Sequence, residues 1–94
     1  MDLRSELFDI KTQVIRGETD EIEEEIEYKN ILIQFYTQGS HLVVEVPETH
    51  GNPHRHSIQN VQKRAIEGFG MDMLPDPSTG SVKGSIELDE LASD

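Results

Sequence analysis

The sequence has no cysteine, so a disulfide framework and a thiolate metal site are both excluded. Its purely aliphatic runs are short, as in Ile31-Leu32-Ile33 and Leu42-Val43-Val44, whereas a membrane span needs about 20 apolar residues. The first residues lack the basic-then-apolar order of a signal peptide. We therefore expect a cytoplasmic protein without a membrane partner.

Positive charge is scarce, because 8 Lys and Arg residues stand against 19 Asp and Glu residues, for a formal net charge of −11. Binding to a phosphate backbone relies on clustered basic side chains, so direct nucleic-acid binding is not expected. Such acidity suits a protein that binds a basic partner or takes the place of nucleic acid on an enzyme, although it also serves solubility alone. Leu, Ile, Val and Phe make up about 27% of the 94 residues, enough for one small core.

An amphipathic helix is predicted over residues 2–16. Apolar residues recur there at spacings of three and four positions, on one stripe of a helix. The stripe consists of Leu3, Leu7, Ile10 and Val14. Gly17 follows as a residue that tolerates the left-handed backbone ending a helix. The stripe either docks on the domain's own sheet or contacts a partner.

The segment 18–27 is the most acidic of the chain, with seven acids and no base. Ile22, Ile26 and Tyr28 fall on alternate positions, which is the period of a strand with one solvated face. Ile22 and Ile26 also fit one face of a helix. We interpret the segment as a short strand.

The segment 31–46 is predicted to form an antiparallel β-hairpin around a two-residue turn at Gln38-Gly39. This turn pairs Phe35 with Leu42, Ile33 with Val44, and Ile31 with Val46. All of these residues then lie on one apolar face, so pairing and hydrophobic pattern agree. Pro47 ends the second strand, because proline has no backbone N–H to donate.

A second helix is predicted to begin at a Ser57 cap and to end at glycines 68 and 70. Its apolar face holds Ile58, Val61, Ala65 and Phe69. A turn-rich connector over residues 74–80 leads to a last strand. That strand contains Val82, Gly84, Ile86 and Leu88 at alternate positions.

Together these elements predict an α+β fold, a small antiparallel sheet with a β-hairpin, packed by one or two helices. Residues 1–17 are assigned to an amphipathic N-terminal helix. Residues 18–88 are assigned to a single α+β domain with an acidic first strand. Residues 89–94 are expected to be a disordered tail.

Neither an enzyme nor a metal or cofactor site is predicted. The sequence has no P-loop, nucleophile elbow or zinc-protease helix. His50, His54 and His56 could approach a metal, but they lack a recognisable ligand signature and lie among ordinary loop residues. Residues 49–66 contain bases and no acid, and this cluster either binds an anion or acidic patch or balances the domain's own carboxylates.

Three landmarks of the sequence occur in one order. They are Val43-Val44-Glu45-Val46-Pro47-Glu48 followed by Gly51, a Ser57-Ile58 helix start with Ala65 and Glu67, and Leu74-Pro75-Asp76-Pro77-Ser78. With these, the chain resembles the HicB-like antitoxin family over about residues 31–88. The resemblance implies a partial RNase H-like fold with a β-β-α-β core and no catalytic carboxylates. It also implies binding of a small basic mRNA-cleaving toxin of the HicA type. No helix-turn-helix or ribbon-helix-helix is recognisable after the last strand, so the resemblance implies inhibition of a toxin but not binding of an operator.

The function predicted from charge and resemblance is that of a non-enzymatic inhibitor, an antitoxin that binds and occludes a basic nucleic-acid-acting protein. One alternative is a phage-type nucleic-acid mimic that blocks a DNA- or RNA-guided enzyme, as anti-CRISPR proteins do. Another is a homodimeric structural module. The predicted partner contacts are the acids Asp20, Glu21, Glu23, Glu24, Glu25 and Glu27, with Leu3, Leu7, Ile10 and Val14 as an apolar anchor.

Overall fold

The structure is a computed structural model that describes residues 3–18, 22–29, 31–47 and 55–93. The elements follow in the order α1 (Leu3–Ile15), β1 (Glu23–Tyr28), β2 (Ile31–Gln38), β3 (His41–Val46), α2 (Arg55–Phe69), β4 (Leu74–Asp76), β5 (Ser81–Glu87) and α3 (Leu88–Ala92). The strands form one antiparallel sheet in the order β1-β2-β3-β5-β4. The fold is therefore α+β, as predicted.

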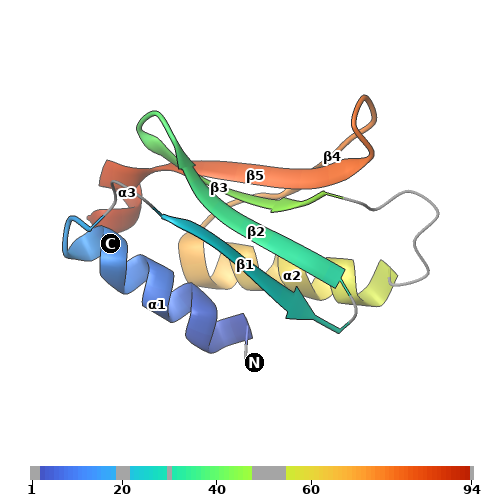
Figure 1. The fold of residues 1–94 in the computed structure, drawn as a ribbon, viewed down its shortest axis with the longest axis horizontal. Helices are drawn as coiled ribbons and strands as arrows, with labels where there is room; N and C mark the ends of the chain where they lie inside the picture. Colours follow the sequence, from blue (N-terminus) through green and yellow to red (C-terminus); the bar gives the residue numbers. More distant parts are fainter. Residues whose placement is uncertain (1–2, 19–21, 30, 48–54, 94) are drawn as a thin grey trace.

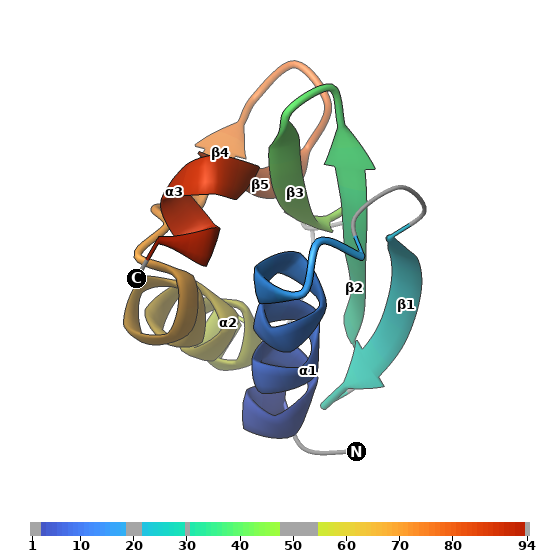
Figure 2. The same cartoon turned by 90° about the vertical axis from the view of Figure 1, so that its left-hand side faces the viewer.

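All three helices lie on one side of the sheet (Figure 1). The sheet curves around α1 and α2, so that the helices occupy its concave side (Figure 2). None of the three helices is long and apolar enough to cross a membrane. Within the described ranges, the convex side of the sheet carries no covering element, and this leaves one face of the sheet open.

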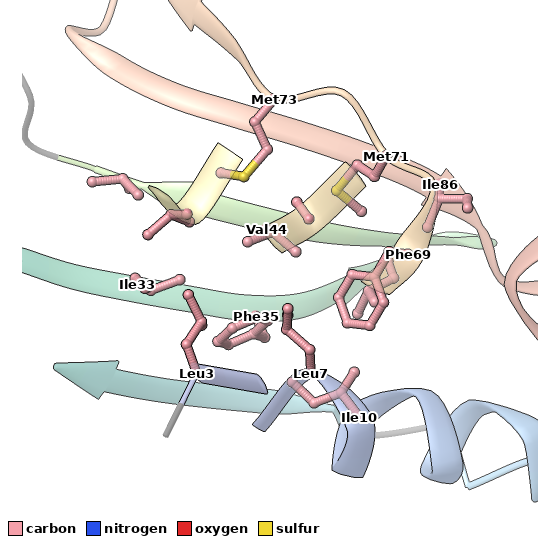
Figure 3. Packing of buried hydrophobic residues seen from close by; sticks show 14 of the residues in the cluster. Leu3, Leu7, Ile10, Ile33, Phe35, Val44, Phe69, Met71, Met73 and Ile86 are labelled. Atoms are coloured by element: carbon pink, nitrogen blue, oxygen red, sulfur yellow. The ribbon is translucent and has the colours of Figure 1, made fainter. Parts of the chain in front are cut away.

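The core lies between the concave side of the sheet and the apolar stripes of the helices (Figure 3). Ile33, Phe35 and Val44 of the central strands are fully buried there. Helix α2 adds Phe69, and Met71 follows from the connector after it. Burial of each large apolar side chain contributes about 1.5–3 kcal/mol. The core therefore joins α1 and α2 to the middle of the sheet.

Helix α1 uses its apolar stripe to pack on the protein's own sheet. Leu3, Leu7, Ile10 and Val14 are all buried in the core. The helix ends at Ile15, and Gly17 follows with φ +76°. Of the two alternatives for this stripe, the structure shows docking on the domain's own sheet.

Residues Glu23–Tyr28, in the second half of the acidic segment, form a strand, as interpreted from the period of two. Strand β1 is an edge strand paired antiparallel with β2, from Glu23 opposite Tyr36 to Tyr28 opposite Ile31. Ile22 and Ile26 are buried on the concave side. The isoleucines thus anchor the strand to the core. The side chains of successive glutamates point to opposite sides of the sheet.

The predicted hairpin is present, but its turn lies one residue later in the sequence than predicted. Each residue of β2 is therefore paired with a residue of β3 two positions later than predicted. Phe35 is paired with Val44 and Thr37 with Leu42, so the turn residues are Gly39 and Ser40. Gly39 has φ +61° at the first central position, where a type II′ turn requires glycine. Hydrophobic pattern could not detect the error, because a shift of two residues keeps every side chain on the same face.

Three further predictions were wrong in detail. Helix α2 begins at Arg55, so Ser57 lies within its first turn and is not its cap. The connector contains the short edge strand β4, whose Pro75 is opposite Val82. The expected tail is largely helix α3, with Leu91 buried and the Leu88 backbone N–H donating to the Ser40 carbonyl at 2.9 Å. A buried leucine and this backbone bond order the segment, although its sequence has no strong helix pattern.

Gly84 allows the connector between α2 and β4 to cross the concave side of β5. A Cβ atom at this position would lie 2.6 Å from the Asp72 carbonyl oxygen and 3.0 Å from the Met71 sulfur. Contacts this short to backbone atoms cannot be relieved by rotating a side chain. The close approach keeps Met71 and Met73 buried.

We expect Gly84→Ala to lower the free energy of unfolding by about 2 kcal/mol, because the connector must move away from β5. Gly68→Ala is the matched control. Its Cβ would meet the Leu7 Cδ1 at 3.3 Å and the Leu7 Cβ at 3.6 Å, and the closer of these atoms is the end of a flexible side chain. Alanine also favours helix by about 0.5–1 kcal/mol over glycine, so little net change is expected. Urea unfolding followed by circular dichroism measures both, and equal stability of the two variants would contradict the prediction.

Candidate protein-binding face

The open face of the sheet is formed by the alternate residues that the helices do not cover. Its rows run across the strands, and one row is Glu25, Gln34, Glu45 and Lys83. The next row is Glu23, Tyr36, Val43 and Ser85. Val43 is buried even on this side. The face is therefore a polar surface with a small apolar centre.

Three carboxylates line the β1 edge of this face. Glu23, Glu25 and Glu27 are all exposed, and alternate residues of a strand lie about 6.8 Å apart on one side. In the part of the chain that the structure describes, none of the three forms an ion pair. The edge strand thus presents a row of uncompensated negative charge.

Two hydrogen bonds hold neighbouring carboxylates in place. The Gln34 Nε2 donates to Glu25 Oε2 at 3.3 Å, and the Tyr36 hydroxyl donates to Glu45 Oε1 at 2.8 Å. Burial and the hydrogen bond to Glu45 raise the pKa of Tyr36 to about 12. Tyr36 therefore stays a neutral donor at neutral pH, and Glu45 adds a positioned negative charge to the centre of the face. A shallow, open depression of about 970 Å³ lies beside Glu23, Glu25 and Tyr36.

Glu24 does not belong to the open face. It is opposite Phe35 and shares the parity of Ile22 and Ile26, so it points to the concave side. There it forms a side-chain hydrogen bond with Glu6 of α1. Of the predicted partner contacts, Glu24 therefore lies on the other side of the sheet from Glu23, Glu25 and Glu27, and the strand alternation alone indicates this.

Glu6 is a buried carboxyl that sequence reasoning missed. Only 8% of its surface is exposed, and its Oε1 has no hydrogen-bond partner within the described chain. The hydrogen bond with Glu24, desolvation, and the negative charges of Glu24 and Asp9 raise its pKa from 4.5 to about 7. Its spacing from Leu3 and Ile10, three and four positions, places it on the apolar stripe. This spacing is the feature of the sequence that could have identified Glu6 as a buried carboxyl.

The other predicted contacts divide into two groups. Leu3, Leu7, Ile10 and Val14 are part of the core, so in this fold they are not available as a surface anchor. Asp20 and Glu21 lie outside the described residues. Glu23, Glu25 and Glu27 are therefore the predicted contacts that the structure brings together on one exposed surface.

Of the three histidines considered as metal ligands, the structure describes one. His50 and His54 lie outside the described residues, while His56 is exposed in the first turn of α2. Among the residues described, no group of three or more His, Asp or Glu side chains is placed to hold a metal ion.

Comparison of the chain with protein-family models, curated proteins and solved structures gives no match. The resemblance to HicB-like antitoxins therefore stays a prediction.

The carboxyl pair of Glu6 and Glu24 predicts a pH-dependent stability. Because the folded state holds the Glu6 proton with a pKa of about 7 against 4.5 for an unperturbed carboxyl, it binds more protons than the unfolded chain between these values. The free energy of unfolding should therefore fall, by about 1 to 2 kcal/mol, as the pH rises through this range.

Glu6→Gln should flatten this dependence and stabilise the protein at about pH 8, because the amide is neutral at every pH. Glu25→Gln is the control, since it removes one exposed charge from the same strand and leaves the buried pair intact. Urea unfolding at several pH values between about 4.5 and 8 measures how steeply the free energy of unfolding changes with pH. A slope in Glu6→Gln as steep as in the unchanged protein would show that Glu6 is not its source.

Proposed function

We propose that the protein is a non-enzymatic, cytoplasmic inhibitor that binds a basic nucleic-acid-acting protein through the open face of its sheet. The row of Glu23, Glu25 and Glu27 carries the proposal, because these carboxylates are exposed and form no ion pair within the described structure. The resemblance to HicB-like antitoxins favours a small mRNA-cleaving toxin as the partner. The face would then occlude the surface on which the toxin holds RNA.

The physical basis is complementary charge with a small apolar contact. Complementary potentials speed association, whereas desolvated apolar groups slow dissociation. On this face Glu23, Glu25 and Glu27 supply the charge at the edge, and Leu32 and Tyr36 lie inward from it on β2. Leu32 is 39% exposed, which leaves part of it available for contact.

A nucleic-acid mimic is the second candidate function. The alternate carboxylates of β1 lie about 6.8 Å apart, similar to successive phosphates along an extended strand. A rigid row of this kind supports binding in the nucleic-acid groove of a DNA- or RNA-guided enzyme. The two candidates share one surface and differ in the size of the partner and in what the protein displaces.

Affinity capture from host lysate at low and high salt tests the proposal with the full chain as bait. A single small basic protein, whose ribonuclease activity the bait inhibits, would support the antitoxin. A large enzyme whose duplex DNA or guide RNA is displaced would support the mimic. Recovery of the same chain alone, as a dimer, would instead favour a homodimeric structural module.

With the captured partner in hand, reversing Glu23, Glu25 and Glu27 to Lys should lower the association rate constant by at least about tenfold at low salt and weaken its salt dependence. The matched control reverses Asp72, Asp89 and Glu90, which are exposed outside β1 and change the net charge equally. Surface plasmon resonance measures both variants. Equal effects of the two would mean that net charge, not this face, steers binding.

A further inference from the structure

Strand β1 ends the sheet on one side and has an unpaired outer edge (Figure 2). Its inner edge pairs with β2 over its whole length, from Glu23 to Tyr28. Within the described ranges, no backbone group is hydrogen-bonded to the outer edge. A free edge of this kind can accept a further strand through main-chain hydrogen bonds.

The hydrogen-bond pattern shows which residues face the outer edge. In an antiparallel pair, one residue directs its N–H and C=O to the partner strand and the next directs both away. The Thr37 N–H donates to the Ile22 carbonyl at 3.2 Å, so Ile22 is a residue of the first kind. Because the register is unbroken to Tyr28, every second residue from Ile22 onward is also bonded to β2. The backbone groups that point to the outer edge are therefore those of Glu23, Glu25 and Glu27.

The same three glutamates have exposed side chains on the open side of the sheet. The backbone groups free for pairing and the row of negative charge thus belong to the same residues. An added antiparallel strand places one residue directly opposite each glutamate, with the two Cα atoms about 5.5 Å apart. Opposite charges in such cross-strand pairs are stabilising, and like charges are destabilising.

The charges of this edge are not balanced within the described structure. Residues 22–29 hold four acids and one base, Lys29. The Lys29 ammonium lies 5.3 Å from the ring centroid of the preceding tyrosine, in the turn after the strand. The acid on the concave side is Glu24. Of the acids on the open side, Glu25 accepts a hydrogen bond from Gln34 through Oε2, and none forms an ion pair in the described chain.

We propose that β1 accepts an antiparallel strand of the partner protein that carries Lys or Arg at three alternate positions. Each base lies opposite one of Glu23, Glu25 and Glu27, and its backbone pairs with the backbone of that glutamate. The residues between the bases lie opposite Glu24 and buried Ile26, where neutral β-branched side chains fit. This inference rests on the proposed function and specifies how the basic partner is bound.

Other occupants of this edge conflict with its charge. A second copy paired through its own β1 across a two-fold axis would place glutamates of one strand opposite glutamates of the other. Nucleic acid carries phosphate charge of the same sign. The opposite edge of the sheet, β4, has three residues and includes Pro75, which has no N–H to donate. The observations therefore favour a basic strand from another protein, bound at β1.

The test uses the full chain and a synthetic peptide of about ten residues, the upper length of a typical strand. The peptide has three Lys residues at alternate central positions, Val or Thr at the other positions, and one terminal Trp. The protein has no tryptophan, so the fluorescence of the peptide reports binding. Replacement of the three Lys residues by Gln should weaken binding by at least about tenfold at low salt. No binding of the Lys peptide, or equal binding of the Gln peptide, would overturn the proposal.

Two N-methylated peptides distinguish strand addition from charge attraction alone. In the bound strand the Lys N–H groups point to β1, and those of the alternate residues point to solvent. Methylation of the three Lys backbone nitrogens should weaken binding by at least about tenfold, because hydrogen bonds to β1 are lost. Methylation of three alternate nitrogens is the matched control and should have a much smaller effect. Equal weakening by both would show that the peptide does not bind as a strand.

Amide hydrogen exchange by NMR gives a second readout on the protein itself. At saturating Lys peptide, exchange of the Glu25 amide should slow by at least about tenfold, because this N–H points to the added strand. The Ile26 amide is the control, since it is already bonded to β2. Unchanged exchange at Glu25 would overturn strand addition. The same result with a captured basic partner would leave the proposed function in place, so the two ideas fail separately.

Charge reversal on the protein localises the contact. Glu25→Lys should weaken binding of the Lys peptide by at least about fivefold, because an attractive pair becomes a repulsive one. Glu90→Lys is the matched control, since Glu90 is exposed on α3 and the change in net charge is the same. Equal effects of the two variants would overturn the proposal. A dimer in light scattering that protects the Glu25 amide without peptide would overturn it in favour of a second copy.

Discussion

Burial of α1 and α2 against the concave side of the sheet decides how the side chains of this protein are distributed. Strands β1, β2, β3 and β5 each have one face in the core, and strand geometry then sends their remaining residues to the open side. Ile26 and Phe35 are core residues, whereas Glu25 and Gln34, their neighbours in sequence, face solvent. The acidic face exists because the helices cover only one side.

The same division separates the charges. The sheet holds Glu23, Glu25 and Glu27 on its open side, while α1 and α2 hold most of the bases. A net charge of −11 describes the sum but not this arrangement.

Much of the fold could be predicted because its main elements have strong periods. The stripe of α1, the alternation in β1 and the apolar pairs of the hairpin each identified their element. The exact register could not be predicted, since the position of Gly39 in the turn, and not the pattern of apolar residues, determines it. Strand β4 has only three residues and contains Pro75, and α3 depends on contacts distant in sequence, so neither has a local signal.

The candidate site was predicted in part for the same reasons. Density of charge in the sequence identifies Glu23, Glu25 and Glu27, but it does not separate them from Glu24, which the strand alternation places on the other side of the sheet. The pairing of Glu6 with Glu24 depends on how α1 lies across β1, which sequence does not reveal. The close contact between α1 and α2 likewise forms only once Leu7 and Gly68 are brought together by the fold.

The order of the strands has a consequence for how the chain folds. Only two residues separate β1 from β2, and two separate β2 from β3, so the pairing of these strands is local in sequence. Strand β5 instead pairs Gly84 with Val44, forty positions away, and must wait until α2 and the connector have been placed. Local contacts form faster than distant ones because they lose less chain entropy on closing. The strand that bears the acidic row thus belongs to the part of the sheet that can assemble early, before the rest of the domain closes around the helices.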